Sequence, residues 1–291
     1  MGGGRDYLFM SFVQCYGTDD TDQERVMVKK MEYKQILCER KGFILTISLN
    51  RPDRLNALNN RTIVELRQAF ADARRDNEVK VVVVTGRGDS FCVGRDLQEY
   101  REYDATPVND WEWRQSDRFA FNSLDDFEKP VIAAVNGLCY AGGFELAAVC
   151  DIRVASETAR FALPEIRAGI FPGGGATWLL PRLVGKGTAM RMILTGGVLD
   201  ATEAKNVGLV DFVVPPDELE DHAGKLAEEI ASKSLAALML AKAAVNLSLD
   251  KDSRSGMKIT AALRALAEST DECREGIEKF SKKYEKQYHT L

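Results

Sequence analysis

The sequence predicts an α/β fold that is followed by a helical C-terminal region. Residues 43–49 alternate as a strand does, with Phe43 as the first of the apolar residues that share one face. Residues 63–73 repeat apolar side chains at the spacing of an amphipathic helix, and residues 79–84 form the β-branched run of a buried parallel strand. A strand, a helix and a buried strand in this order make a βαβ unit, from which α/β folds are built.

Later segments continue this alternation as far as the double proline at 215–216, beyond which only helical patterns remain. Asn60 is a candidate cap for the first helix, and Asp200 is one for a later helix. Further strands are expected at 131–135, 151–155, 161–163 and 209–214, and further helices at 176–184, 188–194, 201–207, 218–232, 235–249, 257–268 and 271–284. We therefore divide the chain into an N-terminal extension (1–30), an α/β core (31–225) and a C-terminal helical region (226–291).

Composition excludes several classes of function. The 291 residues carry a net charge of -5, which argues against nonspecific nucleic-acid binding because such binding needs a dense basic face. No apolar run approaches the length of a membrane span, and the first residues lack the apolar core of a signal peptide. The six cysteines show no close pairing, so we expect reduced thiols in a cytoplasmic protein that contacts no membrane.

The scarcity of histidine narrows the chemistry. The chain has only His222 and His289, and neither lies near a plausible nucleophile motif, so a Ser–His or Cys–His system is not expected. No Cys/His cluster has the spacing of metal ligands, and we predict no metal site. If the protein is an enzyme, its acid–base work falls to carboxylates.

Residues 131–149 form the segment from which the functional argument starts. An apolar strand leads through a turn to Gly142 and Gly143, where the pattern changes to a helix. A glycine pair that opens a helix leaves backbone N–H donors uncovered at the positive end of the helix dipole, where they suit a negative oxygen. Glu145 follows within the first turn. Its carboxylate has two interpretations, as compensation for the dipole or as a catalytic group.

Three other segments contain residues suited to a site. Gly94 allows a close approach of the backbone, and Asp96 suits the start of a helix. Glu165 comes directly after a proline at the end of a short strand, and residues 169–175 make another glycine-rich turn into a helix. The long aromatic segment 99–129 is either a lid or pocket wall, or an amphipathic helix whose aromatic side chains belong to the core.

These segments together resemble the crotonase (enoyl-CoA hydratase/isomerase) superfamily over residues 34–283. The elements that carry the resemblance are NRPDRLNAL (50–58), FCVGRDL (91–97), NG (136–137), AGGFELA (141–147), FALPE (161–165) and GIFP (169–172) with the glycines that follow. Each is weak alone, but their order and spacing together are highly specific. The resemblance implies a spiral of ββα units with two nearly perpendicular sheets, completed by C-terminal helices that mediate trimer contacts.

The resemblance also implies an activity. Members of this superfamily bind acyl-CoA thioesters and stabilise an enolate with two backbone N–H groups, which here correspond to those of Arg95 and Gly142. Hydratases have glutamates at both Glu145 and Glu165, whereas many isomerases keep only the second. We therefore expect reversible hydration of a 2-enoyl-CoA, with Glu145 as the main base that activates water and Glu165 as the donor of the α-carbon proton. No cofactor is expected, because coenzyme A is part of the substrate.

Three alternatives remain open at this point. The reaction could be double-bond isomerisation, or hydration of a specialised cyclic, dienoyl or crotonobetainyl-like acyl-CoA on the same scaffold. The sequence departs from many hydratases at Ala141 and Val93, where glycine and alanine are common. The GFELA segment also occurs in branches that act on crotonobetainyl-CoA, and the aromatic segment 99–129 could suit a bulky or cyclic acyl group. Outside enzymes, the fold could serve a noncatalytic assembly or RNA-binding protein, although the net charge and the intact glutamate pair argue against it.

The resemblance further implies a coenzyme A site and an oligomer. The residues that match its coenzyme A contacts are Arg54, Cys92, Val93, Leu97, Phe280 and Lys283. The last two match positions that can reach the coenzyme A of a neighbouring subunit, or they belong to an amphipathic surface helix. The expected assembly is a homotrimer or a homohexamer built as a dimer of trimers.

Overall fold

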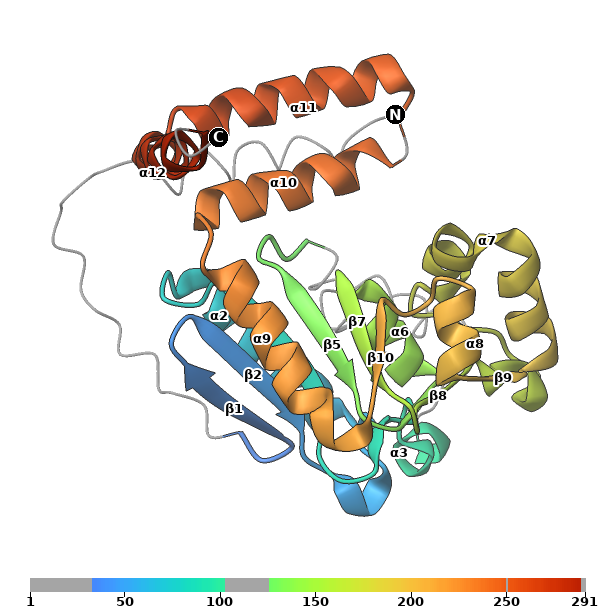
Figure 1. The fold of residues 1–291 in the computed structure, drawn as a ribbon. Coiled ribbons are helices and arrows are strands. Elements are labelled where there is room, and N and C mark those ends of the chain that lie inside the picture. Colours follow the sequence, from blue (N-terminus) through green and yellow to red (C-terminus); the bar gives the residue numbers. More distant parts are fainter. Residues whose placement is uncertain (1–32, 103–125, 250, 289–291) are drawn as a thin grey trace, which may run out of the picture. The chain divides into compact units, whose positions relative to one another are not determined.

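The computed structural model describes residues 33–102, 126–249 and 251–288 (Figure 1). Its larger sheet has six strands in the spatial order β1-β2-β3-β5-β7-β10. These are β1 (Ile36–Lys41), β2 (Ile44–Leu49), β3 (Val81–Gly86), β5 (Val131–Val135), β7 (Ile152–Ser156) and β10 (Phe212–Val214). The β1–β2 pair is antiparallel, and every other pair in this sheet is parallel.

A smaller sheet has four strands in the order β4-β6-β8-β9. These are β4 (Ser90–Cys92), β6 (Leu138–Tyr140), β8 (Arg160–Ala162) and β9 (Val198–Asp200), and only β8 and β9 pair antiparallel. Strands β3 to β8 alternate between the two sheets along the chain, so each pair of consecutive strands contributes one strand to each sheet. The predicted spiral of ββα units is therefore confirmed.

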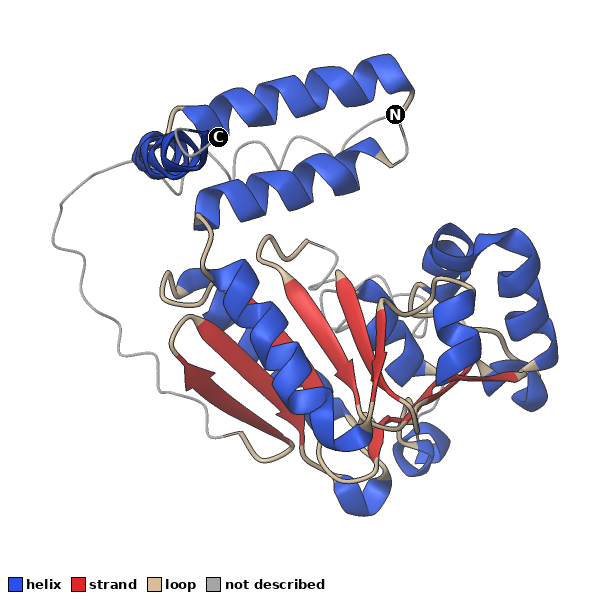
Figure 2. Cartoon of the chain, viewed as in Figure 1, coloured by secondary structure: helices blue, strands red, loops and turns tan. Residues whose placement is uncertain are grey.

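Helices connect and cover the strands (Figure 2). In chain order the helical elements are η1 (Pro52–Arg54), α2 (Asn60–Arg75), α3 (Leu97–Glu102), α6 (Gly142–Val149), η2 (Pro164–Ala168), α7 (Ala176–Thr195), α8 (Ala201–Asn206), η3 (Pro216–Glu218), α9 (Leu219–Ala231), α10 (Leu235–Ser248), α11 (Ser253–Glu268) and α12 (Asp271–Tyr288). Helix α8 begins with a capping box in which Asp200 and Glu203 each accept a backbone N–H, as the cap prediction for Asp200 requires.

Each face of the larger sheet carries its own apolar core. On one face α9 packs across β2, β3, β5 and β7, and small alanines on α9 allow the close approach (Figure 1). On the other face Ile47 and Val84 pack in the same cluster as Leu66 and Phe70 of α2. The predicted one-sided strand at 43–49 is corrected here: Ile44 is buried against α9, and Phe43 is 45% exposed. The pattern failed because a parallel strand inside this sheet is covered on both faces.

Two local predictions also change. The cap of α2 is Asn59 rather than Asn60, because its side-chain oxygen accepts the N–H of Thr62 at 2.8 Å. The helices expected at 176–184 and 188–194 lie within a single element, α7, which is broken at Gly185 (φ 76°, ψ 157°). Glycine adopts this backbone conformation readily, and it lets two helical segments follow each other without a loop.

The C-terminal helices pack on one another, α10 against α11 and α11 against α12. Lys242 ties α10 to the core, since its ammonium group donates to the Asp151 carboxylate at 2.7 Å and to the Lys129 carbonyl at 3.0 Å. The predicted boundary at 225/226 falls inside α9, which packs on the larger sheet, and the extension 1–30 lies outside the described residues. Within the described part, no one helix is long and apolar enough to cross a membrane, and only the bent pair Pro216–Ala231 and Leu235–Ser248 together reaches that length and composition.

Candidate active site

The two segments that carry the predicted N–H donors lie against each other. Gly142 is the first residue of α6, and Arg95 lies in the loop between β4 and α3. A Cβ atom added to Gly94 would be 2.9 Å from the Gly142 nitrogen, and one added to Gly142 would be 3.8 Å from the Arg95 nitrogen. A side chain at position 94 would clash with the backbone at Gly142, so the contact between the two segments requires glycine there. The oxyanion role of these two N–H groups stays a prediction.

The turn into α6 is strained at Ala141. This residue has φ 49° and ψ -125°, a conformation that costs an L-residue of order 1–3 kcal/mol. Its N–H donates to the Ala162 carbonyl of β8 at 2.9 Å, and its methyl lies at the point where a Cβ on Gly94 would meet it, 2.7 Å away. The neighbouring Gly143 has no room for a side chain, because its Cβ would be 2.2 Å from the Cys92 carbonyl oxygen. The turn is thus packed tightly around both donor segments.

Glu145 lies one turn into α6 and is buried, with 4% of the residue exposed. Its Oε1 atom accepts the N–H of Gly174 at 2.6 Å and the N–H of Ala176 at 3.2 Å. Both donors belong to the start of α7, whose cap is Gly175. Such N–H groups and the positive end of a helix dipole favour the anionic carboxylate. The sequence marked 169–175 as a glycine-rich turn but did not predict that this turn holds Glu145.

Glu165 stands in a different environment. It is the second residue of η2, directly after Pro164, and it is half-buried. Its Oε2 atom is buried with no hydrogen-bond partner among the described residues. Desolvation by burial raises the pKa of this carboxyl above its ordinary value of 4.5. Both η2 and α6 pack against α7, which brings the two glutamate-bearing elements to the same helix.

Four of the residues predicted to contact coenzyme A lie in or near the loop that carries Arg95. Leu97 is 68% exposed at the start of α3, and Val93 is half-buried between β4 and that helix. Cys92 is fully buried, and burial raises the pKa of its thiol to about 12, so only its backbone is available to a ligand. The Arg54 side chain is exposed in η1, and its charge helps to lower the pKa of the Asp96 carboxyl.

The two C-terminal candidates lie on α12. Phe280 is 63% exposed, and the side chain of Lys283 lies outside the described residues. Most of the aromatic segment 99–129 is outside them as well, including Tyr103, Trp111, Trp113, Phe119 and Phe121. The choice between pocket wall and core helix for that segment therefore stays a prediction.

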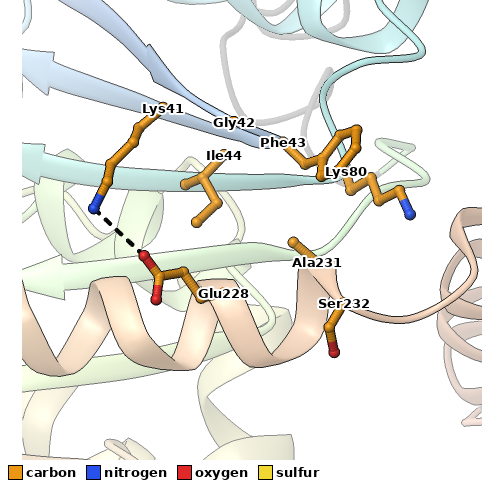
Figure 3. Close-up of a pocket in the computed structure, with 8 residues that line it drawn as sticks. All are labelled: Lys41, Gly42, Phe43, Ile44, Lys80, Glu228, Ala231 and Ser232. Carbon is orange, nitrogen blue, oxygen red and sulfur yellow. Dashed lines mark hydrogen bonds and ion pairs between the residues drawn. The ribbon is translucent and has the colours of Figure 1, made fainter.

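A separate pocket of about 390 Å³ opens elsewhere on the molecule (Figure 3). Its lining comes from the β1–β2 turn, the residue before β3 and the end of α9, and includes Lys41 and Glu228, which pair at 3.4 Å. No predicted site residue lines it. In the part of the chain that the structure describes, no group of three or more His, Cys, Asp or Glu side chains could hold a metal ion.

Comparisons with known proteins identify the family. The model of the family described as enoyl-CoA hydratase/isomerase matches residues 39–290. The crotonyl-CoA hydratase of Syntrophomonas wolfei is 39% identical over 254 residues, covering 87% of this chain and 97% of that protein. The short-chain-enoyl-CoA hydratase of Clostridium acetobutylicum is 40% identical over 247 residues, covering 84% and 90%.

A solved structure agrees with the sequence comparisons. The enoyl-CoA hydratase subunit I of Geobacillus kaustophilus superimposes with a TM-score of 0.82 at 37% identity, covering 87% of this chain and 97% of that one. The fold, the motifs and these matches lead to one conclusion: the chain belongs to the enoyl-CoA hydratase/isomerase family, the crotonase superfamily.

Proposed function

We propose that this enzyme adds water reversibly across the double bond of a 2-enoyl-CoA to give the 3-hydroxyacyl-CoA. The observation that carries the proposal is the pair of glutamates in contrasting surroundings. Glu145 accepts N–H groups at the start of α7, and Glu165 has a buried oxygen without a hydrogen-bond partner among the described residues. Such a contrast suits one group to accept a proton and the other to donate one. The names of the relatives, a crotonyl-CoA hydratase and a short-chain-enoyl-CoA hydratase, point to the same reaction.

The proposed mechanism uses the residues as follows. Glu145 takes a proton from water while the water oxygen forms a bond to C3 of the enoyl group. The electron pair of the double bond moves onto the thioester oxygen, where the N–H groups of Arg95 and Gly142 stabilise the enolate. Glu165 then gives its proton to C2, which completes the 3-hydroxyacyl product, and proton transfer between the two carboxyls through solvent restores the starting state. Dehydration reverses these steps.

The coenzyme A part of the substrate lies, in this proposal, along the loop that holds Arg95. The exposed Leu97 and Arg54 contact its adenine and phosphates beside the backbone of Cys92 and Val93, while Phe280 and Lys283 reach the coenzyme A of a neighbouring subunit. No cofactor is needed, because the reaction transfers only water and protons.

We further propose that the subunits form a trimer or a dimer of trimers. The C-terminal helices support this, because they expose apolar side chains that a monomer would leave in water. These residues are Val245, Leu247, Leu249, Met257, Leu266, Ile277 and Phe280. The free thiols of Cys38, Cys92, Cys139, Cys150 and Cys273 support a reducing compartment, and we place the enzyme in the cytoplasm.

Incubation with crotonyl-CoA tests the function. The conjugated thioester absorbance should fall as water adds, and 3-hydroxybutanoyl-CoA should accumulate until equilibrium. A panel of longer, dienoyl and cyclic enoyl-CoAs would then rank the acyl groups. Absorbance that instead appears when a 3-enoyl-CoA is supplied, with no loss from crotonyl-CoA, would show an isomerase rather than a hydratase.

A further inference from the structure

The loop that carries Arg95 is held by a second segment of the chain. Leu58 and Arg95 form an isolated parallel β-bridge. The Leu58 N–H donates to the Gly94 carbonyl at 2.7 Å, and the Asp96 N–H donates to the Leu58 carbonyl at 2.9 Å. In a parallel bridge of this kind the partner bonds the residues on either side of the central one, whose own N–H points to the opposite edge. The bridge therefore turns the Arg95 N–H away from Leu58.

The side chain of Arg51 binds both strands of this bridge. The Arg51 Nη2 atom lies 2.9 Å from the Asp96 carboxylate, and its Nη1 atom donates to the Ala57 carbonyl at 2.5 Å. Ala57 precedes Leu58, and Asp96 follows Arg95, so a single planar guanidinium connects the two strands of the bridge. The side chains of Arg51 and Asp96 are only 15% and 12% exposed, which limits screening by water.

The backbone of Arg51 is itself fixed. Its N–H donates to the Asn56 side-chain oxygen at 2.9 Å, and its carbonyl accepts the Asn56 N–H at 2.9 Å. Asn56 is 1% exposed, and its amide nitrogen donates to the Ser90 carbonyl at 2.7 Å. The guanidinium thus projects from a turn that is anchored to β4, the strand from which the Arg95 loop departs.

The ion pair is also maintained electrostatically. Burial alone would raise the pKa of the Asp96 carboxyl, but the hydrogen bond and charge of Arg51, together with the Gln98 N–H, outweigh it and lower the pKa. Asp96 therefore stays ionised when the enzyme is at neutral pH, and the charged hydrogen bond to Arg51 persists.

We propose that Arg51 is a positioning residue: its guanidinium, bound to Ala57 and Asp96, sets the place and direction of the Arg95 N–H in the oxyanion hole. This rests on the proposed function of that N–H. Arg51 acts on the reaction through Arg95 and does not itself touch the substrate. If the Arg95 N–H is displaced, the enzyme still folds and binds acyl-CoA, but it stabilises the enolate less.

Steady-state kinetics with crotonyl-CoA test the proposal. In Arg51→Met we expect kcat to fall about 10- to 100-fold while KM changes less than about threefold, since the lost interaction belongs to the transition state. Arg51→Lys, which can reach one partner but not both, should fall between Met and wild type. Asp96→Asn, which keeps a neutral acceptor, serves as a second variant if Arg51→Met does not fold.

A matched control is Arg61→Met. Arg61 also binds a buried carboxylate, that of Glu65 at 2.7 Å, and Glu65 in turn accepts the N–H groups of Lys34 and Gln35 ahead of β1. Loss of this pair should lower thermal stability and leave kcat unchanged, which separates a structural arginine from a positioning one.

A spectroscopic measurement separates this proposal from the proposed function. The visible band of bound dimethylaminocinnamoyl-CoA moves to longer wavelength when N–H donors polarise its carbonyl, whether or not the enzyme turns it over. We expect a red shift in wild type and Arg61→Met and a smaller one in Arg51→Met. A red shift in wild type without crotonyl-CoA turnover would contradict the hydratase function but not the role of Arg51. Equal shifts and equal kcat in Arg51→Met and wild type would overturn the role of Arg51.

Discussion

Helix α6 with the turn before it, and η2 with the turn after it, each supply one glutamate, but the two regions are built differently. In the first, Gly143 has backbone oxygen 2.2 Å from any added Cβ, and Glu145 is 4% exposed with two N–H partners. In the second, Gly169 has nothing within 4 Å of an added Cβ, and Glu165 leaves a buried oxygen without a partner among the described residues. A fixed carboxylate suits a base that must aim a water molecule, and a carboxyl with a raised pKa suits a proton donor.

The largest expected effect comes from neutralising either carboxylate. Glu145→Gln and Glu165→Gln should each lower kcat for crotonyl-CoA hydration by about 10²- to 10⁴-fold, because each removes a proton-transfer group. Folding and coenzyme A binding should stay close to wild type, as circular dichroism and calorimetry would show. Full hydratase activity in Glu145→Gln would break the scheme in which two carboxylates share the work.

The next largest effect is expected at Gly142, whose N–H is one of the two proposed oxyanion donors. An alanine Cβ at 142 fits at ordinary contact distances of 3.5–3.8 Å, but it lies beside the Arg95 nitrogen, in the space proposed for the enolate oxygen. Gly142→Ala should therefore fold and lower kcat by about 10²- to 10³-fold, as loss of one oxyanion donor does. Kinetics and thermal denaturation of the same preparation would check this. Wild-type kcat in Gly142→Ala would place the oxyanion elsewhere.

A third prediction addresses the packing difference directly. Gly143→Ala forces a Cβ against the Cys92 carbonyl and should cost about 3 kcal/mol or more of the free energy of unfolding. Gly169→Ala meets no atom and should cost only the strain of φ +76°, about 1–2 kcal/mol. Chemical denaturation at one fixed protein concentration would measure both. Equal losses would mean that the two turns do not differ in packing as described.

A smaller gain is expected at Ala141. Its φ of 49° strains an L-residue, so Ala141→Gly should raise the free energy of unfolding by about 1 kcal/mol, after the entropy that glycine gains in the unfolded chain is subtracted. The melting temperature should rise by a few degrees or less in a chain of this size. A fall in melting temperature would show that the methyl contact with Gly94 outweighs the strain.

The smallest effect is a pH dependence of stability at Glu165. Because burial raises the pKa of this carboxyl above 4.5, the folded protein holds its proton longer than the unfolded chain does. Stability from this group is therefore present at low pH and is lost as pH rises through the raised pKa. The stability of Glu165→Gln relative to wild type should be greater at about pH 8 than at about pH 4. A difference that grows on acidification would contradict the raised pKa.

Parts of this account were predictable from sequence, and the reasons are physical. Strand β3 gives an unbroken β-branched run and helix α2 gives several turns of an amphipathic pattern, so both were identified within a few residues. In the smaller sheet only β8 was predicted, as a strand at 161–163, because β4, β6, β8 and β9 have three residues each and leave little periodicity. The presence of a second sheet was expected only through the family resemblance.

The candidate site, too, was predictable only in part. Gly94, Gly142 and both glutamates stood out because they lie in or beside short turns that follow predicted strands and because they match motifs of the family. Two sets of contacts were not predicted: the hydrogen bonds from the Gly174 and Ala176 N–H groups to Glu145, and the ion pair between Arg51 and Asp96. They join residues that are 29 to 45 positions apart in the sequence. A single sequence carries no local pattern for such contacts, and only the folded arrangement reveals them.

Exchange of the α-protons of butanoyl-CoA in D₂O tests the division of labour between the two glutamates most directly. This saturated thioester cannot be hydrated, so exchange needs only the oxyanion hole and the group that handles the C2 proton. Proton NMR should show comparable exchange in wild type and Glu145→Gln, and exchange slower by about 100-fold or more in Glu165→Gln. Exchange that survives in Glu165→Gln and disappears in Glu145→Gln would contradict the assignment of Glu165 as the α-carbon proton donor.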